Sequence, residues 1–361
     1  MRLFQNSGLY PAYLTRLNRL AAGATTFTQR RQAFLADRFG ALHFLKPVLD
    51  DEPDAFFTNG DDAALQRLWA REHGLPNKAT LEDILLAQIE EHRTEVFYNI
   101  DPTRYSSAFM NRLPGGVRRK IAWRAAPSPG ANFSAYDLVV CNFPGILESY
   151  RLAGWKSAWF APAHDPLMDR FAANRNRPID VLFVGGYTRH HRKRSELLEA
   201  VSALGGEHNV ALHLDRSRLT RLAEALPPWV PGLGQHRRPD AIQRVSRPPV
   251  FGLDLYLLLS QAKIVLNGAI DMAGADRGNM RCFESMGCGC ALLSDTGNYP
   301  EGMTPGATLA TYSSTSNSIV QLNAMLADTS ATAALADAGR TMVSQRYSKQ
   351  RQWDRFVGLA Q

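Results

Sequence analysis

The sequence predicts an α/β protein built from two halves, each with its own parallel sheet and flanking helices. Short apolar segments typical of buried strands alternate with helical segments, which is the order of stacked βα units. Around residues 161–179 the chain becomes polar and rich in proline and asparagine, and the alternation then starts again. A chain of 361 residues suggests about two domains. We therefore predict one domain at residues 1–163 and a second at 164–347.

The first half opens with a short apolar strand at Arg2–Gln5, after which Ser7-Gly8 turns the chain into a helical stretch. Residues 60–93 are expected to be mostly helical, because their apolar side chains recur at helical spacing. Glu95–Ile100 is rich in β-branched and aromatic residues, which favours a strand. The remaining elements expected here are a helix from about Arg104, strands at Lys120–Arg124, Tyr136–Cys141 and Ser157–Phe160, and a helix at Gly145–Leu152.

The second half opens with the almost fully apolar strand Ile179–Val184, followed by Gly185-Gly186 and a basic helix entry. Residues 226–252 are rich in proline and are expected to form a long loop. The other expected elements are strands at Asn209–Leu214, Lys263–Asn267 and Cys290–Ser294, helices at Leu253–Gln261, Asn279–Met286 and about 315–345, and a last helix from Ser348.

Composition excludes several classes of protein. Four cysteines are too few for a disulfide scaffold in a chain of this length, and no two of them have the spacing of a zinc-binding pair. The N-terminal apolar run is too short for a secretory signal, and no run reaches the length of a membrane span, so we expect a cytoplasmic protein. The net charge of +7 favours a nucleic acid, an anionic membrane surface or a phosphate-bearing substrate as partner.

The segment from residue 279 to residue 295 carries the clearest chemical pattern. A helix begins near Asn279 and Met280, whose backbone N–H groups at a helix start favour an anion such as a diphosphate. Arg281 and Glu284 follow, and the Glu284 carboxylate can accept hydrogen bonds from two vicinal hydroxyls of a ribose. The alternative is an ordinary helix in which a solvated Glu284 pairs with Arg281. Gly287 and Gly289 suit a helix end that turns at once into a strand.

This segment resembles the donor-binding motif of GT-B glycosyltransferases of the group 1 type, most closely the branch of the CgeB-like spore-maturation proteins. In that branch a strand ending in Leu-Asn, here Leu266-Asn267, precedes a loop and then Arg-x-Phe-Glu. Asp276 and Glu284 have the spacing of the two acidic residues of the wider group, although the first is Glu there. The resemblance implies that Glu284 binds the nucleotide ribose, that Asp276 lies near the donor sugar, and that Asn267 belongs to the donor site.

Other parts of the second half are similar to the same family. Gly185 and Gly186 match a glycine loop that lets the backbone approach a diphosphate, and the basic run after them implies cations for the leaving diphosphate. Arg189 and Lys193, four residues apart, share one helix face; the alternative for such a run is a solvated surface. Phe251 matches a loop that contacts the nucleobase, or is a core aromatic. The last helix, about 348–361, resembles one that returns to the first domain.

The acceptor side is expected at the ends of the first-half strands, facing the cleft between the halves. Ser7 and Gly8 match an acceptor-facing loop, and Tyr105 either binds substrate or packs in the core. Asp101, at the end of a strand, is a candidate general base or a turn-capping residue. His164 in the crossing segment is a second catalytic candidate, or it caps a turn.

The resemblance implies an enzyme with two Rossmann-like domains that moves a sugar from a nucleotide-sugar donor to a hydroxyl acceptor. We expect a glycan, lipid-linked or protein acceptor at a bacterial surface. No Asp-x-Asp pair occurs, which argues against a metal-dependent GT-A enzyme, and P-loop and Gly-x-Ser-x-Gly motifs are missing. We therefore expect no metal and no cofactor beyond the substrate.

Two alternatives stay open. A nucleotide-sugar 2-epimerase can have the same architecture, and a basic protein can bind nucleic acid. The basic patches are short, scattered and not interleaved with aromatics, so no nucleic-acid partner is expected. Peripheral contact with an anionic membrane, at the inner face, is the better interpretation of these patches. Leu14–Leu20 is the candidate stretch, and the alternative for it is a core-facing helix.

Overall fold

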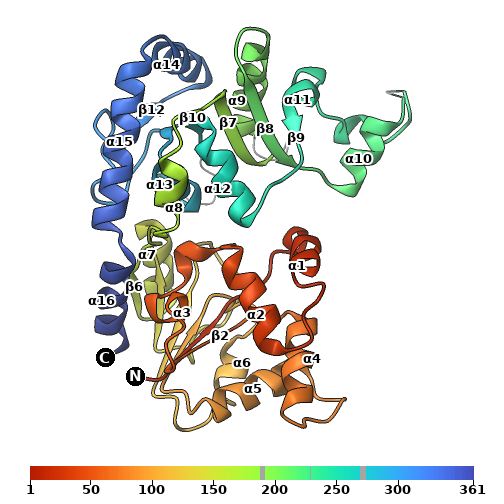
Figure 1. Ribbon diagram of the computed structural model, residues 1–361, viewed down its shortest axis with the longest axis vertical. Coiled ribbons are helices and arrows are strands. Elements are labelled where there is room, and N and C mark those ends of the chain that lie inside the picture. Colours follow the sequence, from red (N-terminus) through yellow and green to blue (C-terminus); the bar gives the residue numbers. More distant parts are fainter. Residues whose placement is uncertain (188–191, 228, 269–273) are drawn as a thin grey trace. The chain divides into compact units, whose positions relative to one another are not determined.

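The computed structural model describes residues 1–187, 192–227, 229–268 and 274–361. The chain divides into two compact units. Unit 1 comprises Met1–Ala163 and Lys349–Gln361, and unit 2 comprises His164–Ser348. Figure 1 shows a sheet flanked by helices in each unit. The expectation of an α/β protein with two parallel sheets is confirmed.

Unit 1 contains a six-stranded parallel sheet in the order β2-β1-β3-β4-β5-β6. Its strands are β1 (Leu3–Asn6), β2 (Ala55–Thr58), β3 (Val96–Asn99), β4 (Arg119–Trp123), β5 (Leu138–Cys141) and β6 (Ser157–Trp159). In register, Asn6 is paired with Thr58 on one side and with Asn99 on the other. The carboxyl ends of the three neighbouring strands therefore place these polar residues side by side.

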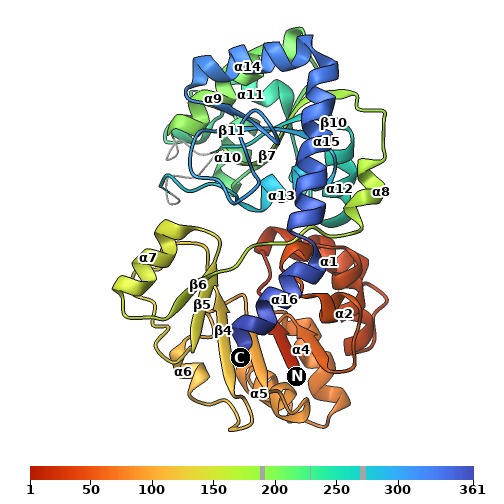
Figure 2. The same cartoon turned by 90° about the vertical axis from the view of Figure 1, so that its left-hand side faces the viewer.

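The helices of unit 1 come from both ends of the sequence. They are η1 (Pro11–Tyr13), α1 (Leu14–Leu20), α2 (Phe27–Ala36), η2 (Ala41–His43), α3 (Lys46–Leu49), α4 (Ala63–Glu72), α5 (Leu81–Glu91), α6 (Ser107–Met110), α7 (Pro144–Leu152) and α16 (Lys349–Ala360). The ammonium of Lys349, at the start of α16, is buried and donates hydrogen bonds to the carbonyls of Ala41, Leu42 and Phe44. Figure 2 shows α16 lying within unit 1, as these bonds require.

Unit 2 contains a second six-stranded parallel sheet, in the order β12-β11-β10-β7-β8-β9. Its strands are β7 (Ile179–Gly186), β8 (Val210–Asp215), β9 (Ser246–Arg247), β10 (Ala262–Leu266), β11 (Ala291–Asp295) and β12 (Ala310–Tyr312). Strands β7, β10 and β11 are central and rich in aliphatic residues, which is typical of parallel strands covered on both faces.

The helices of unit 2 cover this sheet. They are α8 (Met168–Ala172), α9 (Arg192–Ser202), η3 (Ala203–Gly206), α10 (Arg218–Ala225), η4 (Gly234–His236), α11 (Asp240–Val245), α12 (Gly252–Ser260), α13 (Met280–Gly287), α14 (Thr315–Ala327) and α15 (Thr329–Arg346). Helix α9 packs on α14, and α13 packs on α8, α12 and α15. Within the described ranges, no helix is long and apolar enough to span a bilayer.

The structure corrects several expected elements. Strand β2 was not predicted, because Ala55–Thr58 is only four residues long and stands between acidic residues. The expected loop at 226–252 contains α11 and β9. Strand β7 continues through Gly185 and Gly186, which pair in register with β8, so these glycines extend the sheet before any loop begins.

Candidate functional site

The carboxyl edge of the unit 2 sheet holds a network of polar side chains centred on Asn267. This residue directly follows β10 and is buried. Its side-chain amide donates to the Ser294 hydroxyl at 3.0 Å, and its side-chain oxygen accepts from the Asn279 amide at 3.2 Å. The hydroxyl of Tyr312 donates to its backbone carbonyl at 2.9 Å. Asn267 thus joins the ends of three strands to the start of α13.

Helix α13 is defined at both ends by local sequence. Asn279 is its N-cap, and its side-chain oxygen accepts from the N–H of Cys282 at 3.3 Å. The N–H groups of Met280 and Arg281 lie in the first turn, where no carbonyl of the same helix can accept them. At the other end Gly289 has φ of 75°. Residues 289 and 290 donate back to Met286 and Ser285 at 2.9 Å, which completes the glycine-terminated end that the sequence predicts.

Glu284 lies on α13 one turn after its start, and its side chain is buried. The guanidinium of Arg281 donates to its carboxylate at 2.7 Å. Burial raises the pKa of Glu284, and the positive charge of Arg281 opposes this shift. The interpretation of Glu284 as a solvated surface residue is therefore wrong, whereas its pairing with Arg281 is confirmed. Binding of a ribose by Glu284 stays a prediction.

The basic run after β7 is only partly described. Arg189 lies outside the described residues. Lys193 is exposed on α9, and Arg192 pairs with Glu196 at the surface. Arg194, which the sequence analysis did not single out, points toward the sheet, and its guanidinium donates to the carbonyl of Gly268 at 2.6 Å. Among the described residues of this run, Arg194 is thus a cation beside the end of β10.

Two further donor-site candidates lie in unit 2. Asp276 is buried, and its backbone bridges to that of Asn298. Next to it, Arg277 pairs with Asp295 at the end of β11 at 2.6 Å. Phe251 is half-buried and precedes the first residue of α12. Because α12 runs back to the start of β10, Phe251 stands toward the carboxyl edge of the sheet.

His164 is buried within unit 2. Its Nε2 lies 3.4 Å from the carboxylate of Asp169, and its backbone N–H donates to Tyr347 at 2.8 Å. A side chain on Gly287 would approach the imidazole to about 3.0 Å and the sulfur of Met168 to about 2.4 Å. Gly287 is therefore needed for α13 to pack against this segment. Catalysis by His164 stays a prediction.

In unit 1, polar residues gather at the carboxyl ends of β1 and β3. The Asn6 amide donates to Asn99 at 2.9 Å, and the N–H of Asp101 donates to the same Asn99 oxygen at 3.0 Å. The Asp101 carboxylate accepts from the side chains of Arg104 at 3.2 Å and Thr103 at 3.3 Å.

The residues expected in the acceptor-facing loop lie next to this group. Ser7 follows β1, and its N–H donates to Thr58 at 3.1 Å. A side chain on Gly8 would meet the Asp101 carboxylate at about 2.9 Å. Ser7, Gly8 and Asp101 are thus brought together. Catalysis by Asp101 stays a prediction.

Tyr105 does not fit an acceptor-binding role, because only 1% of it is exposed and its ring packs on Phe109 in the core. Asp61, which the sequence alone did not indicate as a site residue, follows β2 at the same edge. Both oxygens of its carboxylate accept from the N–H of Leu9 at 3.0 Å. Burial raises the pKa of Asp61; the Leu9 hydrogen bond opposes the shift and the Asp101 charge adds to it. Recognition of β2 is the signal that would have found this residue.

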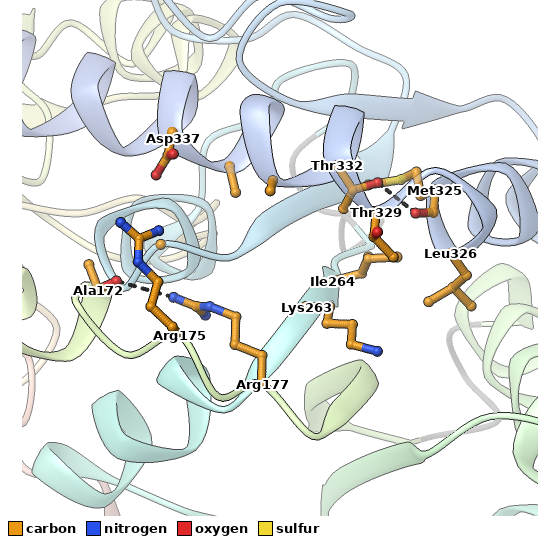
Figure 3. A pocket seen from close by; sticks show the side chains of 13 residues that line it. Ala172, Arg175, Arg177, Lys263, Ile264, Met325, Leu326, Thr329, Thr332 and Asp337 are labelled. Atoms are coloured by element: carbon orange, nitrogen blue, oxygen red, sulfur yellow. Dashed lines mark hydrogen bonds between the residues drawn. The ribbon is translucent and has the colours of Figure 1, made fainter.

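A cavity of about 210 Å³ also lies in unit 2, at the opposite edge of the sheet from the polar network. Figure 3 shows it between α15 on one side and, on the other, Lys263 of β10 and the segment before β7 that carries Arg175 and Arg177. Arg177 donates to the carbonyls of Ala172 at 3.5 Å, Leu259 at 3.3 Å and Cys288 at 3.0 Å, near the ends of α8, α12 and α13. Its guanidinium therefore fixes helix ends. Among the described residues, no group of three or more His, Cys, Asp or Glu side chains is placed to hold a metal ion.

Comparison with known proteins gives a family match for part of the chain. Residues 189–358 match the family described as "Glycosyl transferase-like". Comparison with curated proteins by sequence gives no match.

Solved structures resemble the chain along its whole length. HepE of Anabaena has been solved in complex with UDP-glucose and in complex with UDP and glucose. The complex with UDP and glucose has a TM-score of 0.57 and 15% sequence identity to this chain, and the match covers 99% of each chain. Sucrose-phosphate synthase of Thermosynechococcus elongatus has a TM-score of 0.53 and 12% identity over 99% of this chain and 97% of that one. AviGT4, a glycosyltransferase of avilamycin A biosynthesis, has a TM-score of 0.53 and 13% identity over 99% and 96%. The chain has the GT-B fold of these proteins, and residues 189–358 match the glycosyl transferase-like family.

Proposed function

We propose that the chain is a glycosyltransferase that moves a sugar from a nucleotide-sugar donor to a hydroxyl acceptor. The observation that carries the proposal is the start of α13, which the Asn267–Asn279 hydrogen bond holds at the carboxyl edge of the unit 2 sheet. In open α/β sheets, ligands bind at this edge. The segment lies within the residues that match the glycosyl transferase-like family, and the structurally similar HepE binds UDP-glucose.

The donor half of the proposal follows from the chemistry of α13. A diphosphate placed at its first turn would accept hydrogen bonds from the N–H groups of Met280 and Arg281 and lie at the positive end of the helix dipole. Glu284, held by Arg281, would accept from ribose hydroxyls. Arg194 would bring a further positive charge to the end of β10.

The transfer step breaks the bond between the anomeric carbon and the diphosphate oxygen and forms a bond to the acceptor oxygen. The acceptor proton goes to Asp101 or to the departing diphosphate. Negative charge grows on the leaving group, so N–H donors and cations aimed at it lower the barrier. This account uses no metal. We propose unit 1 as the acceptor side and a bacterial surface glycan, glycolipid or protein as acceptor.

A binding panel identifies the donor. UDP, GDP, dTDP, CMP and ADP, each with its common sugar nucleotides, are added to the wild-type protein while thermal unfolding is followed. A ligand present at about 100 times its Kd stabilises the folded state by about 2.7 kcal/mol, a visible rise in Tm. The sugar nucleotide that stabilises is then tested for slow release of free nucleotide. A rise with one nucleotide class, together with release, supports the proposal, and no rise with any nucleotide contradicts it.

A further inference from the structure

Helix α10 of unit 2 has its apolar stripe turned to solvent. Leu219, Leu222 and Leu226 recur at helical spacing along α10 and its end, and they are 47%, 46% and 36% exposed. Trp229, three residues further on, is 79% exposed. An amphipathic helix of a globular domain normally buries this stripe. Here Ala223 is the buried residue of the helix, and the three leucines are absent from the core cluster of the unit.

The polar side of α10 is the side that is anchored. The side chain of Glu224, on α10, is only 8% exposed. Its carboxylate accepts from Arg238 at 3.0 Å and pairs with Arg216 at 3.2 Å. Burial would raise the pKa of Glu224, but the hydrogen bonds and charges of Arg238 and Arg216 outweigh it and lower the pKa. Arg238 also donates to the hydroxyl of Ser246 on β9 at 2.8 Å. The ionic side of α10 therefore fixes it to the sheet edge and leaves the leucines outward.

Cations flank the exposed stripe. Arg218 and Arg221 are exposed on α10 itself, and the side chain of Arg216 is 43% exposed just before the helix. The one carboxylate of the helix, Glu224, is already paired. The surface formed by these residues therefore combines apolar side chains with an excess of positive charge. Figure 1 shows α10 extending beyond β9, at the margin of the unit 2 sheet.

We infer that this surface, formed by Arg216, Arg218, Leu219, Arg221, Leu222, Leu226 and Trp229, docks on an anionic lipid surface. Leucine and tryptophan side chains enter the boundary between headgroups and acyl chains, and arginines beside them attract anionic headgroups. A second copy of the chain fits less well, because pairing the stripe with itself would bring the arginines of both copies together. The inference is independent of the proposed donor site.

Leu14–Leu20, the stretch that the sequence offers for membrane contact, fits this role less well than α10. In α1 the middle leucine, Leu17, is buried, and Arg16 is bound to Asp37 at 2.6 Å. Its remaining leucines, Leu14 and Leu20, lie at the two ends of the helix. Helix α10 instead presents its whole apolar stripe on the exposed side.

Sedimentation with vesicles tests the inference on the full chain. The vesicles are phosphatidylcholine alone, or phosphatidylcholine and phosphatidylglycerol in equal parts, at low and high salt. We expect wild-type protein to bind the anionic vesicles, to bind neutral ones weakly, and to lose affinity as salt rises. The double variants Leu222→Gln/Trp229→Ser and Arg218→Gln/Arg221→Gln should each bind about tenfold or more weakly.

The matched control is Leu152→Gln, which changes a leucine that is 81% exposed on α7 of unit 1 and should bind like wild type. All substituted side chains are exposed, so the thermal unfolding of each variant should match wild type. Tryptophan emission should shift to shorter wavelength on vesicle binding, and Trp229→Phe should abolish most of the shift. The inference is overturned if wild type does not bind anionic vesicles or if the α10 variants bind as well as wild type. It is also overturned if the stripe instead mediates self-association that Leu222→Gln removes.

Discussion

The side-chain amide of Asn279 donates a 3.2 Å hydrogen bond to the side-chain oxygen of Asn267. Asn279 is the N-cap of α13, and Asn267 is the residue that directly follows β10. The bond therefore attaches the start of a helix to the edge of a sheet. Since the proposed diphosphate site is that helix start, the position of the site depends on this contact.

Replacement of Asn267 by Ala should affect stability and nucleotide binding together. It removes the hydrogen bonds to Ser294 and Asn279 from a buried location, so the free energy of unfolding should fall by about 1–3 kcal/mol. Nucleotide affinity should fall as well, because the first turn of α13 loses its attachment. Urea unfolding and calorimetric titration measure the two effects. Asn323→Ala, on the exposed side of α14, is the control, and equal effects of both variants would refute the account.

Substitutions of Arg177 and Arg175 compare an arginine that holds helix ends with an arginine on the surface. The Arg177 guanidinium binds carbonyls near the ends of α8, α12 and α13, whereas Arg175 is exposed. Arg177→Met should lower the free energy of unfolding by about 3 kcal/mol, because it leaves several carbonyls without a donor. Arg175→Met should stay within about 0.5 kcal/mol of wild type. A similar loss in both variants would contradict this role for Arg177.

Lys349 attaches the C-terminal helix to unit 1. Its buried ammonium donates to the carbonyls of Ala41, Leu42 and Phe44. Lys349→Met should cost about 2 kcal/mol and increase amide hydrogen exchange throughout α16, because these carbonyls lose their donor. Lys78→Met, at an exposed position, serves as the control. Unchanged exchange in α16 would show that the helix is held by its apolar contacts alone.

The raised pKa of Asp61 predicts a pH dependence of stability. Because its pKa is higher in the folded than in the unfolded chain, the folded state binds more protons between the two values. The contribution of Asp61 to stability is therefore greatest below the ordinary value of 3.8 and is lost as pH rises through the folded value. Asp61→Asn should gain stability relative to wild type as pH rises from about 3 to 7. Urea unfolding across this range measures it, with exposed Asp337→Asn as the control; parallel curves for wild type and Asp61→Asn would be incompatible with the shift.

Elements with strong local signals could be predicted from the sequence. The end of α13 at Gly289 follows from the need for a residue that tolerates positive φ where a helix turns into a strand. The apolar central strands of both sheets are equally clear, because parallel strands buried on both faces are rich in aliphatic residues. The pairing of Arg281 with Glu284, which the structure confirms, is what an ordinary helix predicts. The family resemblance adds ribose binding by Glu284, which stays a prediction.

The features that escaped prediction depend on tertiary contacts. Strand β2 is short and flanked by acidic residues, and without it Asp61 had no place at a sheet edge. The burial of Tyr105 is set by packing of loops and helices distant in sequence. Periodicity alone could not predict that the apolar side of α10 faces solvent, because an apolar stripe on a helix normally predicts burial. The ion pairs of the largely covered Glu224 side chain show which side of the helix is anchored.

Calorimetric titration of the preferred nucleoside diphosphate into wild-type, Glu284→Gln and Glu207→Gln proteins tests the central claim most directly. Gln keeps the size of the side chain and removes the charge that would accept ribose hydroxyls, and Glu207 is an exposed residue of the same unit. Thermal unfolding of each protein is recorded first to establish that it is folded. The account predicts that Glu284→Gln binds about tenfold or more weakly, a loss of about 1.4 kcal/mol or more, while Glu207→Gln binds like wild type. Equal affinity in all three proteins, or no binding by wild type, would contradict it.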